Sequence, residues 1–373
     1  MNLTQRISAA CAVSRSWSTC ALGLLFLAFS AGVHAETGVA QGRLITSAAI
    51  AVNPVSHKVY GVNEPGDSIS VFDERTGTTH VVKVGNGPVS LAIDSRLNRI
   101  YVVNDNSDSI SVIDGTRDKV IATIQERTGS HPYMVAVDYA TSKAYVTNTY
   151  SSALTVINGP VNTSNTLKTG SADGIAIDRR THTIFLMTYE SPKIRMVNPV
   201  TAAVSAISVG PHLWGMAFDQ ATSTLYVAHT LANNVVALNE KTRTVSTIPV
   251  GEIPCAIAIN PVTQRLYIVN YGDQTLSVIS ARSHARLATL PVGDHPQAVA
   301  VDSRRNLVYV ANVHGNSVTV IDGSTNLVVD TVPAGKNPYA LALDSTTGRV
   351  FAADYGEPPI TEIPAPHRRP SEQ

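Results

Sequence analysis

The sequence predicts an all-β fold, a single β-propeller built of four-stranded blades. The first observation is a pattern that recurs eight times in the 373 residues: an alanine, an apolar residue, Asp or Asn, a short turn and a Tyr-Val-x-Asn-like run. The second is its spacing, since successive alanines lie 41, 44, 40, 41, 41, 42 and 42 residues apart, a period typical of one propeller blade. The third is that no segment shows a sustained helical period. The alanines are Ala51, Ala92, Ala136, Ala176, Ala217, Ala258, Ala300 and Ala342.

Each repeat contains four predicted strands, named a to d in chain order. In the second repeat they cover residues 89–94, 99–104, 109–114 and 119–124, all rich in Val, Ile, Thr and Tyr and separated by turn residues. Strand a carries the alanine and is placed nearest the ring axis, where a larger side chain would collide with the adjacent blade. The Asp or Asn two residues later is expected to open the a-to-b turn by bonding its own backbone, a structural role.

Strand counting predicts how the ring closes. Strands a and b occur eight times, strand c seven times plus a weak run at 359–363, and strand d seven times. We assign the missing strand to residues 37–45, so that an N-terminal strand completes the C-terminal blade and removes the free edges. Eight blades are therefore predicted. Seven is the alternative, because the third repeat has extra residues at 125–129 and the last is rich in proline.

Both chain ends carry further signals. Residues 1–35 contain Arg6, Arg15, an apolar run and a small-residue ending, which predict a signal peptide cleaved after Ala35. The alternative is an uncleaved N-terminal anchor. The apolar run at 21–31 is too short to span a bilayer, and no longer one follows. We therefore expect a periplasmic or secreted protein with a propeller over 36–363 and a disordered tail at 364–373.

Composition narrows the classes of partner. Without the signal peptide, 26 basic and 28 acidic residues remain and no polybasic segment is present, so nucleic-acid binding is not expected. Only Cys255 remains of three cysteines, which precludes an intrachain disulfide. No phosphate-binding loop, nucleophile elbow or haem-attachment motif is present, and we expect no cofactor. We also expect a monomer without a membrane span in the mature chain.

The strand b sequences indicate a family. The runs at 100–104, 144–148, 266–270 and 308–312 read IYVVN, AYVTN, LYIVN and VYVAN. On these residues the chain resembles the YVTN β-propeller repeat family, including its exported YncE-like members, over 44–363. The resemblance implies the propeller fold, which in outline is shared by lactonases, by domains of quinone-dependent and copper enzymes, and by adhesion modules. Repeats four, five and eight depart from the motif, with Thr188, His229 and Asp354 in place of the final asparagine.

Candidate site residues come from the loops expected on one face, called the top face, where d-to-a and b-to-c loops meet. The position five residues before the recurring alanine, called the slot, differs between repeats, as does the position two residues later. We expect the funnel at this face to bind a peptide, glycan or small molecule without a bond-making step. The candidate ligand-binding residues are His131, His212, His295 and Asn337 in the slot, Tyr133, Trp214 and Tyr339 beside it, and His229 and His314 from the b-to-c side.

Three alternatives remain open for the slot histidines, of which the first is the ligand binding just described. They could serve a lactonase-like or metal-assisted enzyme, with His131, His212 and His295 as zinc or copper ligands. A ring radius of about 13 Å, compared with an imidazole reach of roughly 6 Å, makes one shared ion unexpected. The third alternative is that the His-Pro and Asn-Pro pairs only shape the corners.

Val-Gly pairs ending strand d, such as those at Gly85, Gly210 and Gly293, are expected to supply positive φ. Cys255 has no adjacent histidine and is interpreted as a buried structural thiol.

Overall fold

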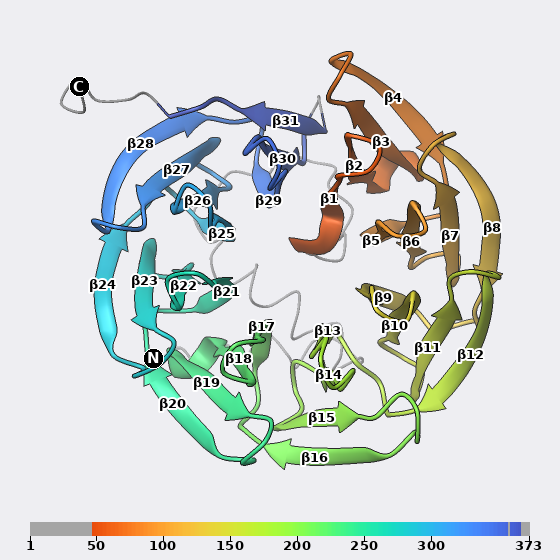
Figure 1. Ribbon diagram of the computed structural model, residues 1–373, viewed down its shortest axis with the longest axis horizontal. Helices are drawn as coiled ribbons and strands as arrows, with labels where there is room; N and C mark the ends of the chain where they lie inside the picture. Colours follow the sequence, from red (N-terminus) through yellow and green to blue (C-terminus); the bar gives the residue numbers. More distant parts are fainter. Residues whose placement is uncertain (1–46, 357–358, 367–373) are drawn as a thin grey trace, which may run out of the picture. The chain divides into compact units, whose positions relative to one another are not determined.

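The computed structural model describes residues 47–356 and 359–366, which form eight antiparallel sheets arranged in a ring (Figure 1). Seven sheets have four strands and the last has three, and in every sheet neighbouring strands are consecutive in sequence. The prediction of an eight-bladed propeller is confirmed, and the seven-bladed alternative is wrong. The predicted signal peptide, the closing strand at 37–45 and most of the predicted tail, from 367 onward, lie outside the described residues and stay predictions.

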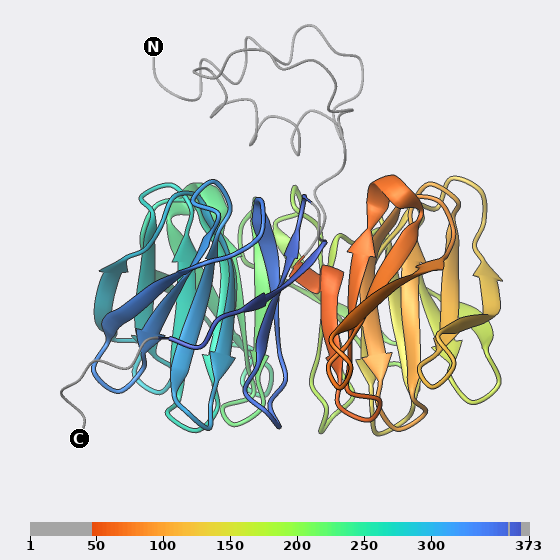
Figure 2. The ribbon, with the colours of Figure 1, turned by 90° about the horizontal axis from the view of Figure 1, so that it is seen from above.

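The strands follow the predicted order from the ring axis to the rim (Figures 1 and 2). The a strands are β1 (Ile50–Asn53), β5 (Pro88–Asp94), β9 (Pro132–Asp138), β13 (Gly174–Ile177), β17 (Leu213–Asp219), β21 (Pro254–Asn260), β25 (Pro296–Asp302) and β29 (Pro338–Leu343). The b strands are β2 (Lys58–Asn63), β6 (Arg99–Asn104), β10 (Lys143–Asn148), β14 (Ile184–Met187), β18 (Thr224–His229), β22 (Arg265–Asn270), β26 (Leu307–Asn312) and β30 (Val350–Asp354).

The outer strands complete each blade. The c strands are β3 (Ser68–Asp73), β7 (Ser109–Asp114), β11 (Ala153–Asn158), β15 (Lys193–Val197), β19 (Asn234–Asn239), β23 (Thr275–Ser280), β27 (Ser317–Asp322) and β31 (Ile360–Ile363). The d strands are β4 (Thr78–Lys83), β8 (Lys119–Gln125), β12 (Thr163–Lys168), β16 (Val204–Ser208), β20 (Val245–Pro249), β24 (Arg286–Pro291) and β28 (Leu327–Pro333).

Helical structure in the described part of the chain is limited to three-residue 3₁₀ turns: η1 (Ser47–Ala49), η2 (Glu64–Gly66) and η3 (Thr230–Ala232). None of them has the length and apolar character that a membrane crossing requires.

The recurring alanine pairs with the motif aromatic. In every blade it lies directly opposite the tyrosine or phenylalanine of strand b, as Ala92 lies opposite Tyr101 and Ala342 opposite Phe351. Opposite residues of an antiparallel pair project to the same face of the sheet, so the small alanine leaves room for a large ring. Tyr101 and Phe351 are fully buried. The recurring alanine and the recurring aromatic residue of each repeat therefore form one cross-strand pair.

The same aromatic also links neighbouring blades. The Tyr60 hydroxyl donates to the Gly115 carbonyl in the c-to-d turn of the next blade, at 3.3 Å, and to Asp118 at 2.9 Å. Tyr226 reaches the carbonyl of Ala281 in the corresponding turn at 3.1 Å. Hydrophobic clusters likewise lie between successive blades, one of them combining Val103 and Val112 with Val135. Each blade is thus stabilised by its neighbour, as expected for a propeller.

The asparagine that ends strand b has a structural role as well. Asn104, fully buried, donates through Nδ2 to Ser109 at 3.2 Å and to Ser111 at 3.0 Å. A β-carbon on Gly85 would lie 2.7 Å from Asn104 Nδ2, so the glycine ending strand d is needed for close approach. The expectation of positive φ at these glycines holds at Gly210 (φ 100°), whereas Gly85 and Gly293 are not among the residues with positive φ. The positive φ instead lies two residues later, in the slot.

The predicted a-to-b turns are confirmed. Asp94 Oδ1 accepts hydrogen bonds from the backbone N–H groups of Arg96 at 2.9 Å and Leu97 at 3.2 Å, and Asp302 repeats the arrangement with Arg304 and Arg305. These carboxylates hold the turn and therefore build the blade.

Candidate functional site

The slot residues are fixed by their backbone. His131, His212, Ile253, His295 and Asn337 all have φ between 50° and 63°, the left-handed region that few non-glycine residues adopt. In these blades the slot carbonyl accepts a hydrogen bond from the first residue of the b-to-c loop of its own blade. The bonds run from the N–H groups of Thr149, Thr230, Tyr271, Val313 and Tyr355, at 3.0 to 3.4 Å.

The slot N–H is held from the preceding blade. His131 N donates to Asp108 Oδ1 at 2.8 Å, and Asn337 N donates to Asn316 Oδ1 at 2.7 Å. Gly87 N and Ile253 N make the equivalent bonds to Asp67 and Asn233. The corner interpretation agrees with these backbone bonds, and it gives the b-to-c acids Asp67 and Asp108 a structural role. It does not explain the imidazoles, because glycine, isoleucine and asparagine hold the same corner.

His131 lies between an acid and an aromatic ring. Its Nδ1 is 3.1 Å from Asp105 Oδ1, a carboxylate whose side chain is 3 % exposed. Its ring packs edge-on against Tyr150, with centroids 5.0 Å apart at 73°. Tyr150 was not singled out in the sequence, yet it is 50 % exposed and comes from the b-to-c loop of the same blade. The His131 imidazole itself is 35 % exposed, so both rings are open to a ligand.

His212 and Trp214 pack against Tyr189, and His229 lies near His212. The Tyr189 ring centroid lies 5.3 Å from that of His212 and 5.7 Å from that of Trp214. Burial, followed by the neighbouring His212, lowers the pKa of His229, so this imidazole is neutral near pH 7. Within the described residues His212 Nδ1 is buried and has no hydrogen-bond partner.

His295 and His314 come together in the seventh blade. Their ring centroids are 4.0 Å apart, and His295 also packs edge-on against Tyr271 at 5.0 Å. His295 Nδ1 is 2.6 Å from Asp294 Oδ1. Burial, and then the charge of His295, lower the pKa of His314. The structure therefore joins two histidines that the sequence placed only on one face.

Two predicted aromatic residues lie beneath the rim. The exposed fractions of Tyr133 and Tyr339 are 7 % and 2 %, so both rings belong to the core of their blades. Above Tyr339 lies Tyr355, 4.3 Å away between centroids and 47 % exposed, next to the slot residue Asn337. Tyr355, like Tyr150, is the exposed ring, and it could have been found from the tyrosines that recur just after strand b.

The structure does not bring the three slot histidines together as ligands of one metal ion. Among residues 47–356 and 359–366, the group of donors close enough for one ion is Asp294, His295 and His314, which includes neither His131 nor His212. The sulfur of the half-buried Cys255 lies 3.7 to 3.9 Å from three backbone carbonyls, and burial raises the pKa of its thiol to about 12, which disfavours the reactive thiolate.

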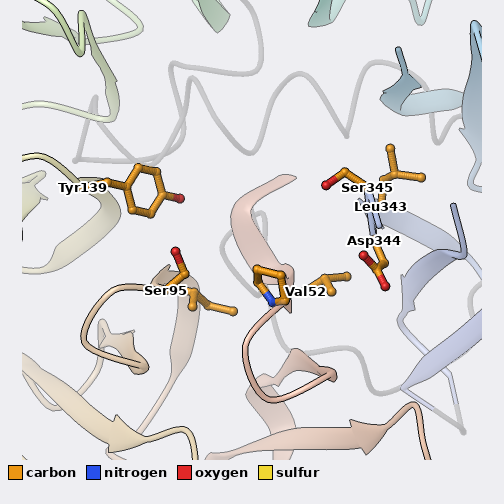
Figure 3. Close-up of a pocket in the computed structure, with 8 residues that line it drawn as sticks. Val52, Ser95, Tyr139, Leu343, Asp344 and Ser345 are labelled. Carbon is orange, nitrogen blue, oxygen red and sulfur yellow. The ribbon is translucent and has the colours of Figure 1, made fainter. Parts of the chain in front are cut away.

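A cavity of about 200 Å³ lies on the opposite face, around the a-to-b turns of four blades (Figure 3). The hydroxyl groups of Tyr139, Ser95 and Ser345 point into it. Its acid, Asp344, already accepts hydrogen bonds from Thr346 N and Thr347 Oγ1. The cavity is small compared with the roughly 300–1,000 Å³ of ordinary ligand pockets, and its carboxylate is committed to a turn.

Comparison with solved structures supports the fold. The chain is similar to Kuenenia stuttgartiensis hydrazine synthase, with 20% identity, a TM-score of 0.61 and coverage of 78% of this chain and 99% of that chain. It is also similar to the dihydro-heme d1 dehydrogenase NirN in complex with DHE, with 11% identity, a TM-score of 0.68 and coverage of 85% and 75%. No family model and no curated protein matches the sequence. At these identities the likeness extends to the propeller architecture alone.

Proposed function

We propose that this chain is an exported, monomeric propeller of the YVTN, YncE-like kind, whose top-face rim binds a peptide, glycan or small-molecule ligand. One observation carries the proposal. Each of the three slot histidines packs against a tyrosine of a b-to-c loop: His131 on Tyr150, His212 on Tyr189, and His295 on Tyr271. The histidine–tyrosine pairs recur on a backbone frame that does not require them.

The pairs offer suitable chemistry for an extended ligand. Tyrosine and tryptophan rings provide flat apolar area with a polar edge, and neutral imidazoles both donate and accept hydrogen bonds. Because the slot backbone is bonded at its N–H or carbonyl, these rings are presented without a large ordering cost on binding. Pairs on separate blades suit a peptide or glycan that crosses the rim better than a compact molecule.

A non-catalytic role is favoured by what the rim side chains touch. His131 is directed at the buried Asp105, and the Cys255 sulfur lies 3.7 to 3.9 Å from three backbone carbonyls. A nucleophile with an adjacent base is the usual requirement for covalent catalysis. The alternative function is a lactonase-like or metal-assisted enzyme that uses the top-face histidines.

The binding proposal is tested by applying the full chain to arrays of glycans and peptides and titrating each bound compound against Tyr150→Ala and Trp214→Ala. We expect both variants to bind at least tenfold more weakly, because each loses an aromatic contact surface of the rim. Tyr139→Ala, on the opposite face, is the matched control and should bind as the parent does. Unchanged affinity in both rim variants would contradict the proposal.

The enzyme alternative has its own readout. Hydrolysis of simple lactones would be followed with the parent chain and with His131→Asn and His212→Asn, which keep a residue suited to the left-handed slot. Turnover that falls at least a hundredfold in either variant at unchanged melting temperature would support the enzyme. We expect no turnover above the uncatalysed rate.

A further inference from the structure

We propose that Asp294, His295 and His314 form a surface site for a divalent transition-metal ion of the zinc and copper class. One ligand atom from each residue lies within 4.8 Å of the other two. An ion bound at about 2.0 to 2.2 Å from each donor needs somewhat shorter separations. Rotation of the Asp294 and His314 side chains supplies this, because both residues are exposed.

The backbone explains why these three side chains meet. Val313 N donates to the His295 carbonyl at 3.0 Å, and Gly315 N donates to the Asp294 carbonyl at 3.3 Å. These two bonds hold the slot segment against the b-to-c loop on both sides of His314. The backbone that carries the donors is therefore held by main-chain contacts, and only side-chain rotation is needed to bring the ligand atoms to an ion.

Other blades use a similar frame with different chemistry, although there the carbonyl before the slot accepts from the residue equivalent to His314 itself. The positions of Asp294, His295 and His314 hold Asn86, Gly87 and Asn106 in the second blade. In the third blade they hold Ser130, His131 and Tyr150, and in the sixth Glu252, Ile253 and Gly272. The frame alone does not call for metal donors. Their coincidence in the seventh blade is the observation that points to an ion.

The donor set suits zinc or copper and not a hard cation. Two imidazoles and one carboxylate favour Zn²⁺ or Cu²⁺, whereas Ca²⁺ and Mg²⁺ require mostly oxygen ligands. His295 Nδ1 lies 2.6 Å from Asp294 Oδ1, so these two donor atoms already face each other, and an ion bound by both replaces the proton that they share. Gln274 Nε2 also donates to Asp294 Oδ1 at 3.2 Å and orients the carboxylate. Three protein ligands leave a coordination position open to water or to a ligand group.

This inference does not rest on the proposed function, because the metal alone is the probe. The full chain would be treated with chelator, dialysed and titrated with zinc sulfate at pH 7.5 by calorimetry. We expect one equivalent to bind, with affinity at least tenfold weaker in His295→Asn and His314→Asn, since each removes one ligand. His131→Asn, in the equivalent slot of the third blade, should bind zinc as the parent does, and magnesium should not bind.

Two results would overturn the metal site: no zinc binding by the parent chain, or equal zinc affinity in the parent and in both seventh-blade variants. The substitutions should fold, because Asn337 occupies the slot and Asn106 occupies the position of His314 in other blades. A measurement on the parent chain needs no variant. In nitrogen-15 spectra zinc should shift the ring nitrogens of His295 and His314 while those of His131 stay in place, and the absence of such shifts would also exclude the site.

Discussion

Asp354 shows how one substituted residue changes the behaviour of a blade. Five blades end strand b with an asparagine, and this aspartate occupies the same place in the eighth, where it is 4 % exposed. Burial raises the pKa of its carboxyl to about 7. Gly335 approaches it as Gly293 approaches Asn312. A carboxyl that is protonated in the fold can donate where the asparagine amide donates.

The raised pKa predicts a pH-dependent stability. Below pH 4 the carboxyl is protonated in both states, and between pH 4 and 7 the folded state holds a proton that the unfolded state has lost. The stabilisation therefore disappears as the pH rises through about 7. Because of this carboxyl, the free energy of unfolding should fall by about 2 to 3 kcal/mol between pH 5 and pH 8. Urea unfolding of the parent and Asp354→Asn at both pH values measures it. In Asp354→Asn, the free energy of unfolding should lack this decrease between pH 5 and pH 8.

Asn312→Asp is the reciprocal control, because it places a carboxyl at the equivalent buried position of the seventh blade. It should introduce a loss of stability at pH 8 that is absent at pH 5. If the parent and Asp354→Asn show the same pH dependence, the raised pKa of Asp354 is refuted.

At the scale of the element, the second, sixth and seventh blades combine the asparagine that ends strand b with a glycine that follows strand d. Gly293 N donates to Asn312 Oδ1 at 3.0 Å, and a β-carbon on Gly293 would lie 2.6 Å from the asparagine amide. Asn312 also donates to Ser317 and Thr319 of the neighbouring strand, at 3.1 and 2.9 Å. The pair therefore fixes the end of strand b, the start of strand c and the corner that leads to the slot.

This coupling predicts a non-additive double substitution. Gly293→Ala should destabilise by about 1 to 3 kcal/mol through the clash, and Asn312→Ala by a similar amount through lost hydrogen bonds to buried hydroxyls. The double variant should lose less than the sum, because the added methyl group occupies space that the asparagine vacates. Urea midpoints of the four chains measure the coupling, and strict additivity would contradict the contact.

The sequence predicted the elements well because each has a local cause. The a-to-b turns depend on one Asp or Asn, and the alanine and tyrosine spacing follows from a pairing within one hairpin. The positive φ of the corner was assigned to glycines such as Gly293, and most of it falls in the slot instead. Nothing in the local sequence around Ile253 predicts a left-handed backbone, because hydrogen bonds with Asn233 and Tyr271, from two other loops, hold it.

At the scale of the whole molecule, the ring closes where the first and eighth blades meet (Figure 1). Arg349 donates to Glu362 of its own blade at 2.7 and 2.6 Å and to Glu74 of the first blade at 3.2 Å. Phe72 and Phe351 pack across the same boundary with centroids 5.6 Å apart. The Glu74 side chain is 4 % exposed, so its charge depends on Arg349.

Removing Arg349 should therefore weaken the closure. Arg349→Met leaves a buried carboxylate without its cation, and we expect a loss of about 3 kcal/mol with faster hydrogen exchange in β1–β3 and β30. Arg117→Met is the control, because Arg117 is 73 % exposed and pairs within its own turn with Asp114, whose side chain is 24 % exposed. It should cost less than about 1 kcal/mol. Equal losses of unfolding free energy in the two variants would show that the boundary ion pair stabilises the fold no more than an exposed ion pair does.

The candidate site could be predicted only in outline. The top face and its histidines followed from loop position, since every slot lies at the same point of its repeat. The partners of those histidines did not follow, because Asp105 and Tyr271 come from the preceding blade and meet their histidines only when the ring is packed. Tyr133 and Tyr339 had the right sequence position, yet their side chains turn into the core.

The central claim is that this propeller binds its ligand through the top-face rim. The most direct test is hydrogen exchange of the full chain with and without a ligand identified on the arrays. We predict protection of the b-to-c loops at residues 148–152, 188–192 and 270–274, with the a-to-b turns at 53–58, 94–99 and 138–143 unchanged. Protection confined to those turns would contradict the account and place binding at the opposite face.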